Sequence, residues 1–313
     1  MPEDTNTTNL QAHVPKLGKV LADPAKPLAE RFRALFTLRN IVCPESVQAI
    51  AAAFEDDSAL LKHECAYVLG QMQDLSAIPL LTSVLENKQQ DAMVRHEAAE
   101  ALGAIGDAES IAVLTRFKDD ESVEVAETCE IALDRIAFKQ QAKQADELSP
   151  SGGYLSVDPA PPAPEADIAS LRDQYLDTSR SLFQRYRSLF ALRNIGNTEA
   201  VEAIVEGLND SSALFRHEAA YVLGQMQHPA SVTGLAERLK DVSENYMVRH
   251  ECAEALGSIA SDEVLPLIKE FAKDEAVVVK ESCEVALDMA EYEASGDFQY
   301  ANAIVANEDQ DHE

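Results

Sequence analysis

The feature that most constrains the fold of this chain is an internal duplication. Residues 32–73 are similar to residues 186–227, and both segments end in AYVLGQMQ. The same offset of 154 residues relates MVRHEAAEALG at 93–103 to MVRHECAEALG at 247–257. Self-similarity at a fixed offset predicts two equivalent halves.

A shorter period appears within each half. The segments KHECAYVLG at 62–70 and RHEAAEALG at 95–103 are 33 residues apart. Their apolar residues recur at helical spacing, and short loops with Gly, Asp or Pro separate them. Helix pairs of this size cannot bury their apolar faces alone, so they stack on one another. The sequence therefore predicts an all-α fold, an α-solenoid with about four helix pairs in each of two pseudo-symmetric halves.

Composition sets the expected domain boundaries. We expect an N-terminal half at 1–139 and a C-terminal half at 168–300. Residues 140–167 are rich in proline and poor in apolar residues, which predicts a flexible linker that lets the halves face each other. Residues 301–313 are predicted to be a disordered tail.

The charge balance restricts the partners. The chain has 26 Lys and Arg against 55 Asp and Glu, a formal net charge of −29. Such a field repels nucleic acid and anionic membranes and attracts basic proteins or cationic ligands. Solubility alone is the competing explanation.

Targeting signals and cysteine usage indicate a compartment. No apolar run approaches the ~20 residues that span a bilayer, and the first residues lack the pattern of a signal peptide. The five cysteines form no CxxC pair and lie in helical patterns, which indicates buried, reduced thiols. We expect a cytoplasmic protein, with the nucleus as a second compartment.

Histidine-glutamate pairs occupy one helical position in the two central repeats of each half. The four pairs are His63-Glu64, His96-Glu97, His217-Glu218 and His250-Glu251. The first repeats carry Leu35-Phe36 and Leu189-Phe190 at this position, so stacking does not require the pair. Imidazoles and carboxylates in register predict a metal site, because a metal needs several such ligands at one point.

Helix geometry suggests how the histidines divide. Neighbouring helices lie ~8–10 Å apart, so His63 and His96 can share one ion while His217 and His250 share another. Two histidines with a carboxylate form the facial arrangement of non-haem Fe(II) sites. Cysteine is absent from the set, which argues against structural zinc. We therefore expect two metals bridged between the halves.

At these residues the chain resembles the deoxyhypusine hydroxylases, a family of HEAT-repeat di-iron monooxygenases. The signature is four His-Glu pairs in an R/K-H-E-x-A-x-x-L-G context, and all four are intact here. The resemblance implies an enzyme that hydroxylates the deoxyhypusine side chain of translation initiation factor 5A, the final step of hypusine formation. It also implies two Fe²⁺ ions as cofactors, O₂ as co-substrate and a monomeric protein.

The resemblance further implies a division among the carboxylates. Glu97 and Glu251 would join the four histidines as iron ligands. Glu64 and Glu218 belong to the same metal set and would have a second role in facing the amino groups of the substrate. No catalytic residue is expected beyond this metal centre.

Two other pairs of residues have weaker indications. Met93 and Met247 lie one helical turn before His96 and His250, where they would line an apolar channel for the substrate or fill the core. Tyr67 and Tyr221 follow His63 and His217 by four residues. A hydrogen bond behind the metal ligands and simple packing are both compatible with that spacing.

Three other functions remain as alternatives at this point. A metal-free HEAT-repeat scaffold would use the acidic surface for binding but leaves the register of the His-Glu pairs unexplained. A protein similar to the bilin lyases would need neither a transition metal nor two matched halves. A hydrolase would use the same two-metal centre with zinc or manganese to activate water.

Overall fold

The computed structural model describes residues 10–141, 153–261 and 263–295, and it gives them an all-α architecture. The helices of this part of the chain form eight consecutive pairs, four in each half, and each pair has an outer helix followed by an inner one. The outer helices are α2 (Val14–Ala22), α4 (Pro44–Ala51), α6 (Ile78–Glu86), α8 (Ile111–Phe117), α10 (Ile168–Leu176), α12 (Thr198–Glu206), α14 (Val232–Lys240) and α16 (Leu265–Phe271). The inner helices are α3 (Leu28–Arg39), α5 (Ala59–Met72), α7 (Ala92–Ile105), α9 (Val123–Gln141), α11 (Leu182–Ile195), α13 (Ala213–Met226), α15 (Tyr246–Ile259) and α17 (Val277–Ser295). Short 3₁₀ helices lie at Ala52–Glu55, Leu75–Ala77, Ala108–Ser110, Gly207–Asn209 and Pro229–Ser231. The predicted α-solenoid is confirmed.

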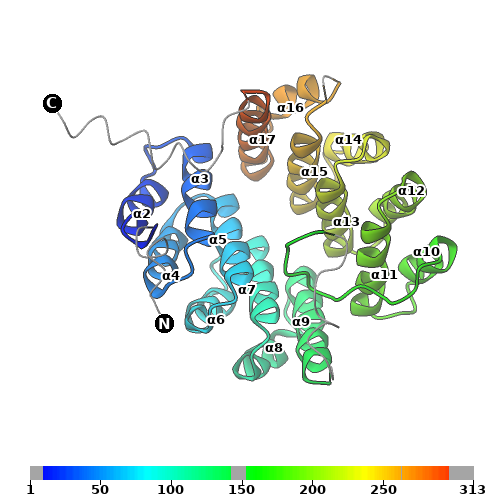
Figure 1. The fold of residues 1–313 in the computed structure, drawn as a ribbon, viewed down its shortest axis with the longest axis horizontal. Helices are drawn as coiled ribbons and strands as arrows, with labels where there is room; N and C mark the ends of the chain where they lie inside the picture. Colours follow the sequence, from blue (N-terminus) through cyan, green and yellow to red (C-terminus); the bar gives the residue numbers. More distant parts are fainter. Residues whose placement is uncertain (1–9, 142–152, 262, 296–313) are drawn as a thin grey trace, which may run out of the picture.

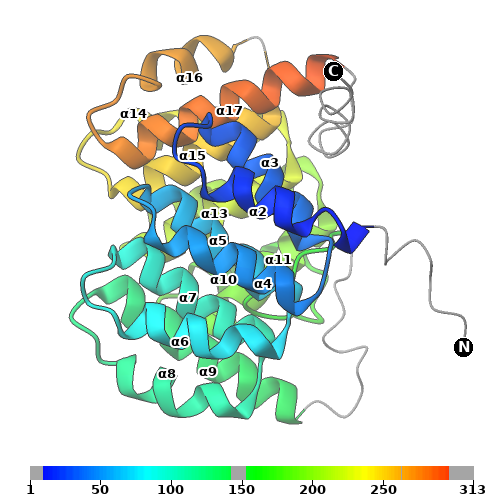
Figure 2. The ribbon, with the colours of Figure 1, turned by 90° about the vertical axis from the view of Figure 1, so that its left-hand side faces the viewer.

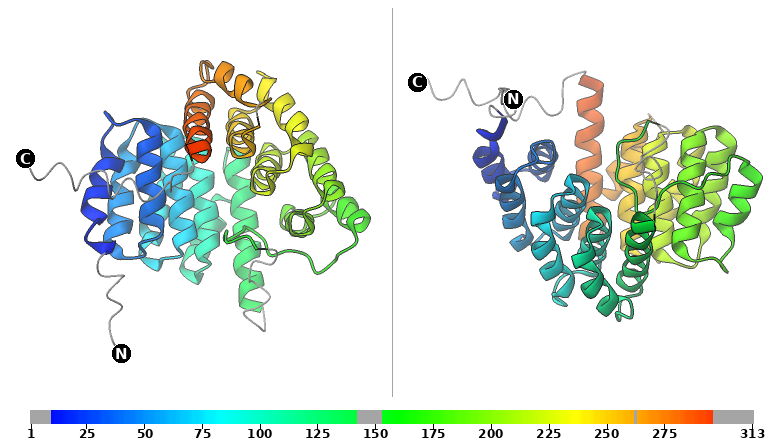
Figure 3. Two further views of the ribbon diagram at one scale, coloured as in Figure 1. Left: turned by 45° about the horizontal axis from the view of Figure 1, so that its top comes forward. Right: turned by 60° about the horizontal axis from the view of Figure 1, so that its bottom comes forward.

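The inner helices pack against one another in chain order, and the series closes into a ring. Helix α9 packs on α11 and α13, and at the other junction α17 packs back onto α3 and α5. Figure 1 shows the inner helices around a common centre with the outer helices at the periphery. Figures 2 and 3 show α17 beside α3, although these helices are at opposite ends of the described chain.

Glycine in the repeated LG motif lets the inner helices approach closely. A Cβ added to Gly70 on α5 would lie 2.8 Å from the Cα of Ala101 on α7, and one added to Gly103 would lie 2.7 Å from the Cβ of Ala132 on α9. Both distances are shorter than a van der Waals contact, so a larger residue forces the helices apart. The motif therefore sets the spacing that brings the His-Glu positions together.

A buried arginine on the inner helix of each of four repeats joins the outer helix of its own repeat to the segment after the outer helix of the next repeat. Arg95 donates to the carbonyl of Leu85 and forms a bidentate pair with Asp120, at 3.1 and 2.6 Å. The same two partners, ten residues before and twenty-five after, recur for Arg31, Arg185 and Arg249. This register places Phe32-Arg33 and Tyr186-Arg187, and not Leu35-Phe36 and Leu189-Phe190, at the His-Glu position of the first repeats. Because each guanidinium meets a backbone acceptor and a carboxylate, its charge is compensated inside the protein.

The linker differs from the predicted flexible tether over residues 153–163, which we call the strap. The backbone of Val157 exchanges two hydrogen bonds with the side chain of Gln71, at 3.1 and 2.8 Å. The Asp158 carboxylate accepts from Arg193 at 3.0 and 2.6 Å, and its carbonyl accepts from Arg135 at 2.8 Å. The strap is therefore fixed to both halves. The remaining linker residues 142–152 and the predicted tail at 301–313 lie outside the described residues.

The cysteines and the helix lengths agree with two further expectations. Cys43, Cys65, Cys129, Cys252 and Cys283 are all free and buried. Within the described parts of the chain, no helix combines the length and apolar character that a bilayer crossing requires.

Candidate metal centre

Four inner helices bring the four histidines to the centre of the ring. His63 lies on α5, His96 on α7, His217 on α13 and His250 on α15. The ring of His63 lies 5.5 Å from that of His96, 5.9 Å from that of His217 and 5.3 Å from that of His250, measured between centroids. All four residues are at most 5% exposed. We call them the histidine cluster. Both halves contribute to it equally, as a shared metal centre requires.

The two halves place glutamates in the cluster in the same way. Nε2 of His63 lies 3.2 Å from the carboxylate of Glu97, and Nε2 of His217 lies 3.3 Å from that of Glu251. In each case the glutamate comes from the next repeat of the same half. These contacts put Glu97 and Glu251 between the imidazoles, where a ligand to the same ion would lie.

Glu64 and Glu218 lie at the edge of the same cluster. The Glu64 carboxylate is 3.2 Å from Nδ1 of its neighbour His63. Oε1 of Glu218 is buried and has no hydrogen-bond partner among the described residues. Both side chains line the central cavity, so both are available to a ligand that enters it.

Three groups of ligand atoms lie close enough to hold a cation, each within 4.8 Å. They are His63 with His96 and Glu97; His63 with His217 and His250; and His250 with Glu251 and Glu254. The first group is the set expected for one ion of the N-terminal half. The second joins the halves, so the two expected ion positions are adjacent.

Sequence reasoning missed Glu100 and Glu254, which also line the cavity. They follow His96 and His250 by four residues, the position that Tyr67 and Tyr221 occupy in the other two repeats. Side chains four residues apart share a helix face, so this spacing could have revealed them. Each half thus offers three carboxylates to the cavity, one more than the His-Glu pairs supply.

The two tyrosines contact each other across the halves. The hydroxyl groups of Tyr67 and Tyr221 are 2.8 Å apart, and Gln225 donates to the Tyr221 hydroxyl at 3.0 Å. Neither tyrosine has a hydrogen bond to the histidine cluster among the described contacts. They form a polar pair in the wall of the cavity.

Burial makes ionisation of the glutamates around the histidine cluster unfavourable. It raises the pKa of Glu64, and raises the pKa of Glu218 and of Glu251 well above the usual range. Several carboxylates in one buried space repel one another, and a cation between them relieves that repulsion. Crowded, buried carboxylates of this kind are typical of functional sites.

The imidazoles show the complementary effect. Burial lowers the pKa of His217 to about 4 and lowers the pKa of His96 and His250 well below the usual range. Burial acts in the same direction on His63, but the carboxylates of Glu97 and Glu64 outweigh it and raise its pKa. Neutral imidazole is the form that coordinates a metal.

The hydrogen-bond inventory agrees with a metal centre. Both ring nitrogens of His96, Nδ1 of His217 and Nε2 of His250 are buried without a hydrogen-bond or ion-pair partner among the described residues. An unpaired buried polar atom usually costs about 1–3 kcal/mol, so four such nitrogens together are unfavourable unless a ligand satisfies some of them. The donor set of imidazole and carboxylate suits iron or another first-row transition metal.

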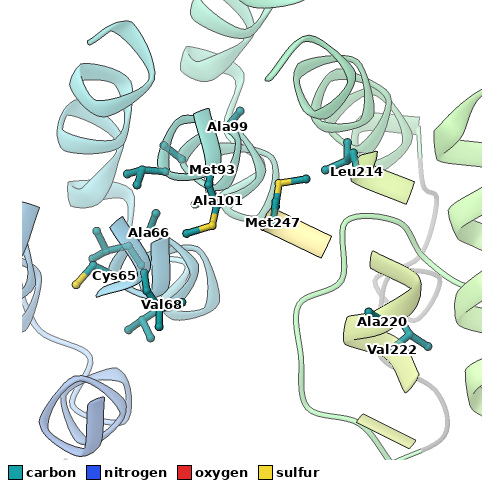
Figure 4. Close-up of a cluster of buried hydrophobic side chains, with 14 of the residues drawn as sticks. Cys65, Ala66, Val68, Met93, Ala99, Ala101, Leu214, Ala220, Val222 and Met247 are labelled. Carbon is teal, nitrogen blue, oxygen red and sulfur yellow. The ribbon is translucent and has the colours of Figure 1, made fainter. Parts of the chain in front are cut away.

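A cavity of about 180 Å³ leads to this centre, and Phe36 lies in its wall with the glutamates and tyrosines. Met93 and Met247 do not line it. They are 1% and 2% exposed and pack among buried apolar side chains (Figure 4). This burial fits the core-filling role of the two methionines. They point into the packed interior because α7 and α15 are buried on every face at that level.

Comparison with known proteins identifies the repeat type. The HEAT repeats family matches residues 47–134 and 168–244, and the PBS lyase HEAT-like repeat matches residues 248–274. The second match covers little more than one helix pair. It describes the repeat and carries no evidence for lyase activity.

Full-length relatives share a single name. The chain is 55% identical over 294 residues to a mouse deoxyhypusine hydroxylase, with 94% of this chain and 97% of the relative aligned. A Xenopus laevis deoxyhypusine hydroxylase is 57% identical over 296 residues, covering 95% and 97%. The solved structure of human deoxyhypusine hydroxylase in complex with glycerol is similar at a TM-score of 0.88 and 54% identity, covering 92% of this chain and 99% of that one.

Proposed function

Because this chain belongs to the deoxyhypusine hydroxylase family, we propose that its central site hydroxylates the deoxyhypusine side chain of a protein substrate. The chain is an enzyme that inserts one oxygen atom into a carbon–hydrogen bond. The observation that carries the proposal is the meeting of four buried histidines from both halves, with their four glutamates lining the adjacent cavity.

The cofactor that best fits this donor set is a pair of Fe²⁺ ions. His63, His96 and Glu97 would hold one ion, and His217, His250 and Glu251 the other. The unpaired ring nitrogens and the short distances between histidines and glutamates support this assignment. Bound ferrous ions supply the activation of O₂, with one oxygen atom entering the substrate and the other leaving as water when an external reductant provides two electrons.

The remaining carboxylates suit the cationic part of the substrate. Deoxyhypusine carries amino groups on an aliphatic chain, and Glu64 and Glu218 line the cavity beside the proposed ligands. Charge-assisted hydrogen bonds from those amines to the carboxylates would fix which carbon lies next to the oxidant. The buried surroundings exclude bulk water and strengthen these contacts.

Translation initiation factor 5A is the protein substrate that we propose. The formal net charge of −29 favours association with a basic segment around the modified lysine. A monomer is sufficient, because one chain supplies both halves of the site. We propose the cytoplasm, with the nucleus as a second compartment, as the location of the reaction.

The scaffold alternative is not favoured by the position of the His-Glu pairs. A binding surface would expose them, whereas all eight side chains lie in the interior. The lyase alternative gives no reason for two matched sets of imidazoles.

The proposal is tested by incubating the reduced, iron-loaded protein with the deoxyhypusine form of the factor and O₂. Mass spectrometry of the modified peptide should show the gain of one oxygen atom on that side chain. A variant with both His63 and His217 changed to alanine serves as the control and should give no gain. An unmodified substrate with the wild-type enzyme, at full iron loading, would refute the proposed reaction.

A further inference from the structure

The duplication gives the ring two equivalent junctions between its halves. At one, α9 meets α11 and α13, and the Ser212 hydroxyl donates to Glu127 at 2.7 Å. At the other, α17 meets α3 and α5, and the equivalent Ser58 donates to Glu281 at 2.8 Å. We call them the α9–α11 junction and the α3–α17 junction. A structural difference between the two junctions therefore indicates through which of them a substrate could reach the metal centre.

The strap fills the α9–α11 junction. Arg193 on α11, whose side chain is fully buried, donates to the Asp158 carboxylate, while Arg135 on α9 donates to the Asp158 carbonyl. Arg135 also donates to the carbonyl of Gly103 at 2.7 Å. Arg187 on α11 donates to Pro161 in the strap at 3.2 Å. Gln225 links the strap to the tyrosine pair, because it donates to the Ser156 hydroxyl at 3.1 Å and to the Tyr221 hydroxyl at 3.0 Å.

Among the described residues, no segment equivalent to the strap lies in the α3–α17 junction. Met289 on α17 stands at the position equivalent to Arg135, and it is 37% exposed. A groove of about 400 Å³ lies here, with Phe32, Phe36, Val285 and Met289 in its walls. We call it the open groove.

The open groove leads into the metal centre. It shares Phe36, Glu64, Tyr221, Glu251 and Glu254 with the central cavity. Its wall on α3 and α17 is apolar, Gln225, Gln227 and Ser258 lie on the α13 and α15 side, and its inner end is acidic. At the rim, Arg33 on α3 forms an ion pair with Asp288 on α17.

We propose that the modified lysine of the protein substrate reaches the centre through the open groove alone, and that the strap closes the equivalent route. This inference rests on the function proposed above. The aliphatic part of the side chain lies against Phe32, Phe36 and Met289, and its amino groups reach Glu64 and, deeper in the central cavity, Glu218. An extended chain with an apolar middle and cationic nitrogens matches this order of apolar wall and carboxylates.

One substitution makes the open groove resemble the α9–α11 junction. Met289→Arg places at the open groove the residue that the α9–α11 junction carries at position 135. The new cation would repel the amino groups of the substrate, so kcat/KM should fall by roughly 100-fold or more. Iron content and the helical circular dichroism signal should match the wild type. Met289→Leu keeps the apolar wall and should change kcat/KM by less than about 3-fold.

The reciprocal substitution tests the other junction. Arg135→Met removes the strap contact on the closed side without touching the open groove. Its KM should stay within about 2-fold of the wild type, because Arg193 still holds Asp158. A loss of substrate affinity in Arg135→Met that equals the loss in Met289→Arg would overturn the assignment.

A cysteine at the groove gives a measurement that needs no turnover. The five natural cysteines are buried, so a maleimide should react first at the introduced thiol of Met289→Cys. Saturating deoxyhypusine-containing factor should slow this alkylation at least roughly 10-fold in the metal-free protein. An unchanged alkylation rate would refute the groove as the route. If the factor protects the introduced thiol of Met289→Cys but iron-loaded wild-type protein never hydroxylates the factor, the proposed reaction is wrong and the route stands.

Discussion

Replacing Asp158 by alanine should measure how firmly the strap holds the two halves together. The side chain of Arg193 is 0% exposed and that of Asp158 is 7% exposed, so this is a buried ion pair. Its two hydrogen bonds, at 3.0 and 2.6 Å, make it bidentate. The change therefore leaves the guanidinium without its carboxylate in the interior.

The expected loss of stability depends on the contacts that Arg193 keeps after Asp158 is replaced. Removing one partner of a buried pair costs about 3–5 kcal/mol, because a buried charge is left uncompensated. Gln225 still accepts from Arg193 at 2.7 Å, and the Phe190 ring lies 4.8 Å from the guanidinium carbon. We therefore expect the lower end, about 3 kcal/mol, or a fall in Tm of about 6 °C for a chain of this size.

Thermal unfolding followed by circular dichroism on metal-free protein measures this change. Glu206→Ala is the matched control, since Glu206 also forms a bidentate pair, with Arg172, but those side chains are 45% and 43% exposed. That variant should keep its Tm within about 1 °C of the wild type. Equal Tm values for Asp158→Ala and Glu206→Ala would refute the reasoning, because burial would then make no difference.

Two further predictions concern the centre and the ring. Replacing Glu64 or Glu218 by alanine should raise KM for the protein substrate by roughly 10-fold or more, because an amine of the substrate loses a charged acceptor. Iron content should stay near the wild-type value. If Glu64→Ala loses as much iron as His63→Ala, Glu64 is a metal ligand and the prediction is wrong. Gly103→Val should lower the free energy of unfolding by about 3 kcal/mol or more, because a Cβ at this position would lie 2.7 Å from the Cβ of Ala132. Urea unfolding measures this change. A variant as stable as the wild type would mean that α7 and α9 separate easily.

The repeats and the histidine positions could be read from the sequence because they depend on local periodicity. The 154-residue offset predicts two halves, and the four His-Glu pairs occupy one position on successive inner helices. Stacking of similar helices then brings equal positions together. Nothing beyond the helix pattern was needed to expect His63 near His96.

The parts that could not be predicted depend on contacts between distant residues. The strap has a composition typical of linkers, yet Arg193, Arg135 and Gln71 supply acceptors and donors that fix it. These partners are remote in sequence from Asp158, so composition gives no sign of them. Closure of the ring by α17 on α3 likewise depends on geometry summed over the whole chain.

The roles of the methionines could not be separated from the sequence for a related reason. Met93 and Glu100 are seven residues apart on α7, so they share a helix face and lie on opposite sides of His96 along the helix axis. Helical spacing does not say at which level of that face a cavity lies. The side chains around Met93 are packed, whereas Glu100 and Glu254 line the cavity.

Iron-edge anomalous diffraction from crystals of the iron-loaded protein tests the central claim most directly. We predict two adjacent peaks, one between His63, His96 and Glu97 and the other between His217, His250 and Glu251. Peaks outside the histidine cluster, or none within it at full iron loading, would contradict the account.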